Sequence, residues 1–274
     1  MTPRRRWALA ALLALLAVPG RAEAQAGGAP VFSWVVTDLK MGICVDFLID
    51  PAVARGLVPE GYRVVPATHS TGLSPIVARE IAGDSVHLAW IPSRYCVLEG
   101  ASVTAGDQFV TSGKDSVPVM LAYWGIAADR NEGEPRFDQL FALQFWTSDW
   151  HVQKPSQDAF IQVATLKRSL TKVPESINDR YEIRMGKTSI SWEGQLRRDS
   201  TAVTTPLAAP LLYVGLRAIH FSASVTGQPA WSRNPAGVLQ VTGKDDLAQA
   251  MQASPIRHFG PVFWGGNARV DFSR

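Results

Sequence analysis

The sequence has few of the residues that build metal and nucleotide sites. It contains two cysteines and five histidines in 274 residues, and the histidines stand singly, at positions 69, 87, 151, 220 and 258. No two of them are four residues apart and no Cys-x-x-Cys occurs, so we predict no metal site. A Gly-x-Ser-x-Gly turn, a Walker loop and a dinucleotide fingerprint are also missing, so we predict no cofactor. A Ser-His-Asp triad stays open, because such triads are recognised by geometry and not by spacing.

The N-terminus carries a pattern that is typical of a secretory signal. Arg4–Arg6 precede an unbroken apolar run, Trp7–Val18, and small residues then stand at alternating positions up to Ala26. A run of this length is short for a permanent membrane span, although an uncleaved anchor is the alternative interpretation. We predict a signal peptide over residues 1–26, cleaved near Ala24 or Ala26, and an exported protein in the periplasm or outside the cell. No stable membrane span would remain after cleavage.

The mature chain has no excess of either charge. The whole sequence has 27 basic and 24 acidic residues, but residues 1–26 contain four arginines and one glutamate, which leaves 23 of each. A neutral chain gives no electrostatic reason to expect nucleic acid or an anionic membrane surface as a partner. The expected partner is a small-molecule ligand or substrate, and a homo-oligomer stays open.

The two cysteines, Cys44 and Cys96, each lie in a strand-like run. Disulfides persist in the compartments that an exported protein reaches. One bridge between them and two buried free thiols are both compatible with the sequence, because spacing does not show whether their backbones approach each other.

The segment Lys40–Pro66 contains the clearest local pattern. Its first part alternates apolar residues with a period of two, which suits a half-buried strand. Asp50 and Pro51 then predict the start of a short helix, because an aspartate caps free amide groups and a proline fits the first helical position. The run Pro59–Gly61 ends the helix and turns the chain into the next strand.

Short alternating runs with turn residues between them continue to the C-terminus, which predicts a mainly β chain and one domain over residues 27–274. A second helix is expected over Asp245–Met251. So many antiparallel strands usually close into a barrel or stack as a sandwich. The expected strands are Phe32–Val36, Gly42–Ile49, Tyr62–Val65, Pro75–Ile81, Ser85–Ile91, Arg94–Leu98, Val117–Ala127, Leu140–Thr147, Phe160–Leu166, Tyr181–Met185, Thr188–Arg197, Leu212–Thr226, Val238–Thr242 and Pro261–Phe272.

The order of these pieces resembles the acetoacetate decarboxylase superfamily. The first helix ends in Leu57–Gly61, reading Leu-Val-Pro-Glu-Gly, and Ser254–Ile256 leads into a closing strand over Gly260–Phe272. The resemblance covers most of the mature chain and lies in order and spacing. It implies an antiparallel double-layered β-barrel or cone of acetoacetate decarboxylase-like type, with a few short helices and a central apolar cavity.

The resemblance also implies a catalytic lysine that forms a Schiff base with a keto acid. Such an amine must be deprotonated, which burial or a neighbouring cation favours. Lys172 lies in the segment Val163–Pro174, closest to the place of the family's lysine. The resemblance implies that this segment is a catalytic loop. Thr171 and Val173 flank it where the family has other residues.

Two further roles follow from the same resemblance. Lys40 stands where the family has a basic residue that holds the substrate carboxylate, although lysine lacks the forked geometry of arginine. Asp115 is the carboxylate nearest to the place of the family's glutamate. The alternative for Lys40, Asp115 and Lys172 alike is a solvated surface charge.

Nine tryptophans in 274 residues are many, and several lie in strand patterns. Trp124, Phe145 and Trp146 could pack a barrel core or line an apolar ligand site. His151 follows Asp149 in a turn close to them, which makes it a candidate acid–base group.

These observations leave two functions open. The first is an exported lyase that uses Lys172 and Asp115 for Schiff-base chemistry on a small keto acid or related carbonyl compound, with Lys40 and the aromatic residues binding it. The second is a non-catalytic barrel protein that binds an apolar small molecule.

Overall fold

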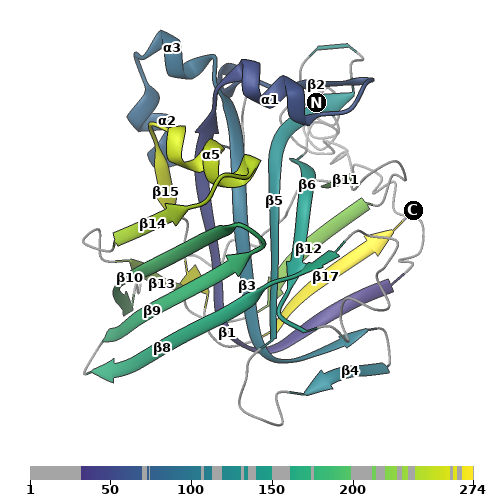
Figure 1. Ribbon diagram of the computed structural model, residues 1–274, viewed down its shortest axis with the longest axis vertical. Helices are drawn as coiled ribbons and strands as arrows, with labels where there is room; N and C mark the ends of the chain where they lie inside the picture. The colour runs from purple at the N-terminus through teal and green to yellow at the C-terminus, as the bar shows by residue number, and fades with distance from the viewer. Residues whose placement is uncertain are drawn as a thin grey trace, which may run out of the picture.

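A computed structural model describes most of the chain after the predicted signal peptide (Figure 1). The described residues are 32–69, 73, 75–105, 108–112, 119–130, 133–134, 140–149, 161–173, 176–198, 212–213, 220–226, 230–233, 238–259, 262–263 and 267–273. The predicted signal peptide, Asp115 and His151 lie outside them. No helix within these ranges is long and apolar enough to cross a membrane.

Strands make up most of the described chain, as the alternating runs predict. The strands are β1 Phe32–Ile49, β2 Tyr62–Val64, β3 Ile91–Ala105, β4 Gln108–Ser112, β5 Val119–Arg130, β6 Leu140–Thr147, β7 Ile161–Val163, β8 Thr165–Val173, β9 Ser176–Met185, β10 Thr188–Arg198, β11 Leu212–Tyr213, β12 His220–Thr226, β13 Ala230–Arg233, β14 Val238–Thr242, β15 Arg257–Phe259, β16 Val262–Phe263 and β17 Asn267–Ser273. The helices are short: α1 Pro51–Leu57, the 3₁₀ turn η1 Ala67–His69, α2 Pro75–Ile81, α3 Ser85–Leu88 and α5 Asp246–Ala253.

Long antiparallel strands form a curled half-barrel. β1 pairs with β3 along its length, β3 pairs with β5, and β5 pairs with β6. The other edge of β1 pairs with β17, which continues to β12. A second sheet of β8, β9, β10 and β14 packs against the long strands and crosses them in Figure 1. The mainly antiparallel β class with few helices is therefore confirmed.

The long strands have two faces, and both are buried. Because successive side chains point to opposite faces, Val45, Tyr95 and Trp124 share one side, which we call the core face. This face packs against Tyr181 and Trp192 of the second sheet, and all five side chains are at most 1% exposed. The opposite side carries Arg94 and is called the Arg94 face below.

The first helix begins as its sequence predicts. The Asp50 carboxylate accepts a 2.7 Å hydrogen bond from the Ala52 N–H, and Pro51 occupies the first helical position. The chain then turns at Gly61, whose φ of 87° is a left-handed conformation that glycine adopts without strain. The helix near the C-terminus begins in the same way, because the Asp245 carboxylate caps the Ala248 N–H at 3.0 Å.

Two predicted strands, Pro75–Ile81 and Ser85–Ile91, are wrong, because α2 and α3 occupy most of these segments. Val77 and Ile81 are buried on one side of α2, and this four-residue spacing belongs to a helix. The Asp84 carboxylate accepts from the N–H groups of Val86 and His87, which starts α3. In segments this short, the helical and strand patterns overlap, and the cap decides between them.

Candidate functional site

A polar centre lies on the Arg94 face of the three longest strands. Asp46 on β1 is the direct partner of Arg94 on β3, and Arg94 is the direct partner of Gly125 on β5. The neighbouring row on the same face joins Cys44, Cys96 and Tyr123 in the same way. Regular antiparallel pairing therefore brings a carboxylate, a guanidinium and a phenol into adjacent rows.

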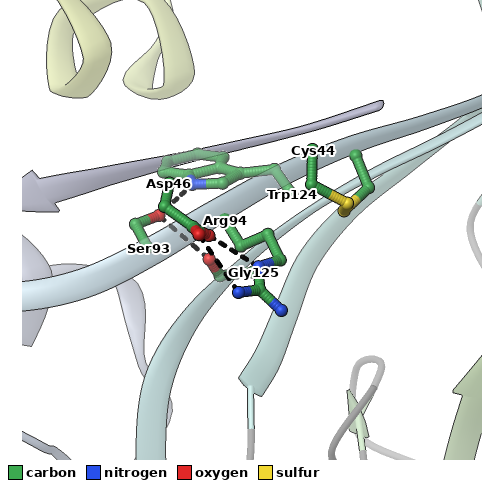
Figure 2. A network of polar contacts seen from close by, with 7 residues as sticks. Cys44, Asp46, Ser93, Arg94, Trp124 and Gly125 are labelled. Atoms are coloured by element: carbon green, nitrogen blue, oxygen red, sulfur yellow. Dashed lines mark hydrogen bonds and ion pairs between the residues drawn. A yellow bond between two sulfur atoms is a disulfide. The ribbon is translucent and has the colours of Figure 1, made fainter. Parts of the chain in front are cut away.

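The carboxylate and the guanidinium form a two-pronged ion pair. Arg94 donates from Nε to Asp46 Oδ1 at 2.6 Å and from Nη2 to Oδ2 at 3.2 Å. The Arg94 side chain is 22% exposed and that of Asp46 is 12% exposed, so the pair is largely screened from water. Figure 2 shows that the other Nη group points away from Asp46. Within the described residues that group has no acceptor, so it can donate to a ligand.

The surroundings keep Arg94 and Tyr123 in defined protonation states. Burial acts to lower the pKa of Arg94, but the charge of Asp46 and its hydrogen bonds outweigh burial and raise that pKa above its ordinary value. Burial raises the pKa of Tyr123 to about 12, while Arg94 acts to lower it. The site therefore contains a permanent cation and a phenol that keeps its proton at neutral pH.

The disulfide borders this centre. Cys44 and Cys96 are direct partners in the register, with their Cα atoms 4.1 Å apart, and they form a disulfide. Both are buried. Because they lie two residues from Asp46 and Arg94 on the same strands, the covalent bridge and the ion pair occupy adjacent rows of the sheet (Figure 2).

The predicted aromatic residues divide between the two faces. Trp124 and Trp146 belong to the apolar cluster of the core face, and the Trp124 Nε1–H donates to Ser93 Oγ at 2.8 Å. Phe145 is the partner of Tyr123 on β6, with ring centroids 6.0 Å apart. Only Phe145 among the three therefore lies beside the polar centre. The alternation of a strand explains this, because consecutive residues cannot line the same wall.

The two predicted lysines lie on separate strands. Lys40 is the bulged residue of β1, between Leu39 and Met41, where the register with β3 shifts. Lys172 is opposite Ile177 in the β8–β9 pair. Its segment is a strand, so the predicted loop is wrong here: hydrogen bonding to β9 keeps residues 165–173 extended. The lysines whose side chains the structure describes, Lys167, Lys187 and Lys244, are all exposed.

Two hollows formed by described residues lie away from this centre. A groove of about 880 Å³ crosses the outer side of the second sheet and is lined by polar and charged side chains, including Lys167, Arg180 and Glu193. A hollow of about 590 Å³ lies between α1 and β2, beside Arg63. No three histidine, cysteine, aspartate or glutamate residues come together as a metal site in the ranges that the structure covers.

Sequence reasoning missed Asp46, Arg94 and Tyr123. A pattern could have found the first two, because each is a charged residue inside an apolar alternating run and each lies two positions from a cysteine. If the cysteines are bridged across antiparallel strands, residue 46 must face residue 94. Tyr123 carries no comparable pattern, since the part of its strand from Val119 to Ala128 contains no charged residue.

No protein-family model matches the sequence, and no curated protein matches it. Solved structures match its fold. The enduracididine biosynthesis enzyme MppR complexed with pyruvate has a TM-score of 0.53 at 12% identity, covering 93% of this chain and 92% of that chain. An acetoacetate decarboxylase-like enzyme from Sphingomonas wittichii RW1 has a TM-score of 0.51 at 9% identity, covering 88% of this chain and 90% of that chain. The chain therefore has the acetoacetate decarboxylase-like fold that the sequence resemblance predicts.

Proposed function

We propose that this chain is an exported protein that binds a small keto acid of the pyruvate type at the Asp46–Arg94–Tyr123 centre. The observation that carries the proposal is the setting of the two-pronged Arg94–Asp46 pair, which lies on the central strands in the row next to the buried Tyr123 phenol. Similar structures support the ligand class, because MppR was solved with pyruvate and with the condensation product of pyruvate and imidazole 4-carboxaldehyde.

Each group of the centre has a distinct task in binding. Asp46 occupies two donors of Arg94 and so fixes the plane of the guanidinium, while the second Nη group donates to the carboxylate or carbonyl oxygen of the ligand. Tyr123, protonated because burial raises its pKa to about 12, supplies an O–H donor beside the cation. Phe145 adds an apolar ring next to that phenol.

Two independent features support the proposal of export. The charged and apolar pattern of residues 1–26 is that of a secretory signal. The disulfide between Cys44 and Cys96 supports the same conclusion, because disulfides persist outside the reducing cytosol. Detection of the mature chain in a periplasmic or secreted fraction, with cleavage near Ala24 or Ala26, tests this part of the proposal.

Pyruvate binding by isothermal titration calorimetry tests the site. We expect the double variant Arg94→Met/Asp46→Leu, which removes both charges together, to bind pyruvate at least tenfold more weakly than the wild type. The matched control is Arg63→Met/Asp129→Leu, because Arg63 and Asp129 form a pair of nearly the same geometry elsewhere. Equal affinity of the two double variants would contradict the proposal. Preference for an apolar ligand over pyruvate would favour the non-catalytic alternative.

Schiff-base catalysis through Lys172 is a separate proposal that the fold class supports. Borohydride reduction in the presence of pyruvate, followed by peptide mass mapping, tests it. An adduct on Lys172 would establish the chemistry, and the absence of an adduct on every lysine would exclude it for this ligand.

A further inference from the structure

We propose that His258 is the acid–base group of this site and moves a proton at the carbon next to the ligand's carbonyl. This inference rests on the proposed function, because it needs the keto acid to be held by Arg94. It assigns a reaction class, enolisation, that does not require a lysine.

The register of the sheet places His258 in the same row as the ion pair. β15 pairs with the edge of β1 that faces away from β3, and His258 is the direct partner of Asp46. Asp46 in turn is the direct partner of Arg94. An imidazole, a carboxylate and a guanidinium therefore follow one another across three adjacent strands, although they are far apart in the sequence.

The side chains of this row share one face. Directly opposite residues of antiparallel strands point to the same side of a sheet. Ile256, two residues before His258, supports this, because it packs with Leu48, which lies two positions from Asp46 on β1. His258 is half-buried. It therefore shares the Arg94 face with Asp46 and is turned away from the apolar core.

The spacing suits a small bifunctional ligand. Neighbouring strands lie about 4.8 Å apart, so two strand spacings separate the backbones of His258 and Arg94 by about 10 Å. His258 and Arg94 lie on the two strands that flank β1, on either side of Asp46 in the register, and the proposal requires a three-carbon keto acid to contact both of them across that interval. The nearest charged groups in register around His258 are Asp46 and Arg94 on the neighbouring strands and Arg257 on its own strand.

The chemistry of such a row is proton transfer beside a polarised carbonyl. A nitrogen of neutral His258 takes a proton from the methyl carbon of pyruvate. The electron pair of the broken C–H bond forms the C=C bond of the enolate, and the carbonyl electron pair moves to its oxygen. That oxygen accepts hydrogen bonds from the Arg94 guanidinium, whose charge stabilises it. Return of a proton from His258 restores pyruvate, so no other reactant is needed.

Hydrogen–deuterium exchange at the pyruvate methyl group measures this step directly. Full-length mature protein in D₂O is mixed with pyruvate, and loss of the methyl signal is followed by proton NMR. We expect the wild type to accelerate exchange and His258→Gln to lose at least tenfold of that acceleration, with pyruvate affinity changed less than threefold. His87→Gln is the matched control, because His87 is also half-buried and contacts an aspartate, Asp84. It should exchange like the wild type.

Two further measurements separate the possible failures. His258→Ala with added imidazole should recover part of the exchange rate if the imidazole itself carries the proton, whereas a structural role gives no recovery. If pyruvate does not bind the wild type, the proposed function fails and this inference with it. If pyruvate binds but exchange is absent, or is the same in His258→Gln, the site stands and the assignment of His258 is overturned.

Discussion

Two Arg–Asp pairs in this molecule have nearly the same geometry but different surroundings. Arg94 and Asp46 meet at 2.6 and 3.2 Å, and Arg63 and Asp129 meet at 2.7 and 3.2 Å. Both pairs join direct partners on antiparallel strands, β3 with β1 and β2 with β5. Their arginine side chains are similarly exposed, 22% and 25%. Geometry of the pair alone therefore does not identify a ligand site.

The surroundings separate the two pairs. The Nη2 group of Arg63 also donates to the Gly133 carbonyl at 2.8 Å, which fixes the turn after β5. Arg94 lies on the central strands beside the disulfide and the buried Tyr123, whereas Arg63 lies on the three-residue strand β2. We interpret Arg63 as a structural tie at the end of β5 and Arg94 as a binding group on the central strands.

The largest expected effect concerns the disulfide that borders only the Arg94 pair. The bridge closes a loop between cysteines 52 residues apart. Cys44→Ala/Cys96→Ala should therefore lower the free energy of unfolding by about 4 kcal/mol, mainly by freeing the unfolded chain. Urea denaturation measures this change. Pyruvate affinity of the folded variant should change less than threefold, because the strand pairing still holds Arg94. A loss below 1 kcal/mol would mean that the bridge does not constrain the chain.

The next effect concerns the two ion pairs themselves. Arg94→Met leaves Asp46 with an unpaired charge in a largely buried place, and we expect a loss of about 2 kcal/mol, reduced from the value for fully buried pairs because both groups retain some exposure. Adding Asp46→Leu should recover most of it. Arg63→Met should cost no more than Arg94→Met, since the two arginines are similarly exposed. Urea midpoints of the single and double variants complete a double-mutant cycle for each ion pair. A much larger cost at Arg63 would reverse our interpretation of the two regions.

The pKa of Tyr123, followed by absorbance, tests whether water is excluded from the Arg94 face. Burial raises the pKa of Tyr123 to about 12, above the ordinary value of 10. The neutral phenol is favoured in the folded state, so its contribution to stability is present below pH 10 and is lost as the pH rises from 10 through 12. Absorbance of tyrosinate in the wild type and in Tyr123→Phe isolates this group. Titration of Tyr123 near pH 10 in the folded protein would show that water reaches the site.

The smallest effect is expected from an exposed pair that serves as a third comparison. Arg184 donates to Glu182 at 2.6 Å, and this hydrogen bond lowers the pKa of Glu182 below its ordinary value of 4.5. Because that pKa is lowered, its contribution to stability exists above pH 4.5 and disappears as the pH falls further. Water screens the pair, so Glu182→Gln should leave the urea midpoint at pH 7 unchanged within error. A clear decrease in the urea midpoint would show that the short Arg184–Glu182 distance stabilises the fold even though the pair is exposed.

The sequence predicted the fold better than the site. The strand pattern from Gly42 to Ile49, the Asp50 cap and the Asp245 cap all appear in the structure, because they depend on local rules of alternation and capping. The helices over Pro75–Ile81 and Ser85–Leu88 were missed because segments of one or two turns carry too few residues to separate the two periods.

The polar centre could be predicted only in part. Asp46 and Arg94 must be partners if Cys44 and Cys96 are bridged across antiparallel strands. The sequence therefore predicts this pair only when the bridge is assumed. His258 joins the row through a pairing between strands more than two hundred residues apart, and no local rule predicts which edge a distant three-residue strand will choose. Lys172 was chosen because its position resembles that of the family's lysine. Its segment is a strand because it pairs with β9, and the resemblance did not predict that pairing.

The central claim is that Arg94, and not Arg63, contacts a small keto acid. Side-chain ¹⁵N–¹H NMR of arginine-labelled protein tests it most directly, with the two resonances assigned from Arg94→Lys and Arg63→Lys. On addition of pyruvate we expect the Arg94 Nε and Nη signals to shift in a saturable manner, while those of Arg63, which donates to Asp129 and Gly133, stay in place. Saturable shifts at Arg63 with none at Arg94, or no shift at either residue, would contradict the account.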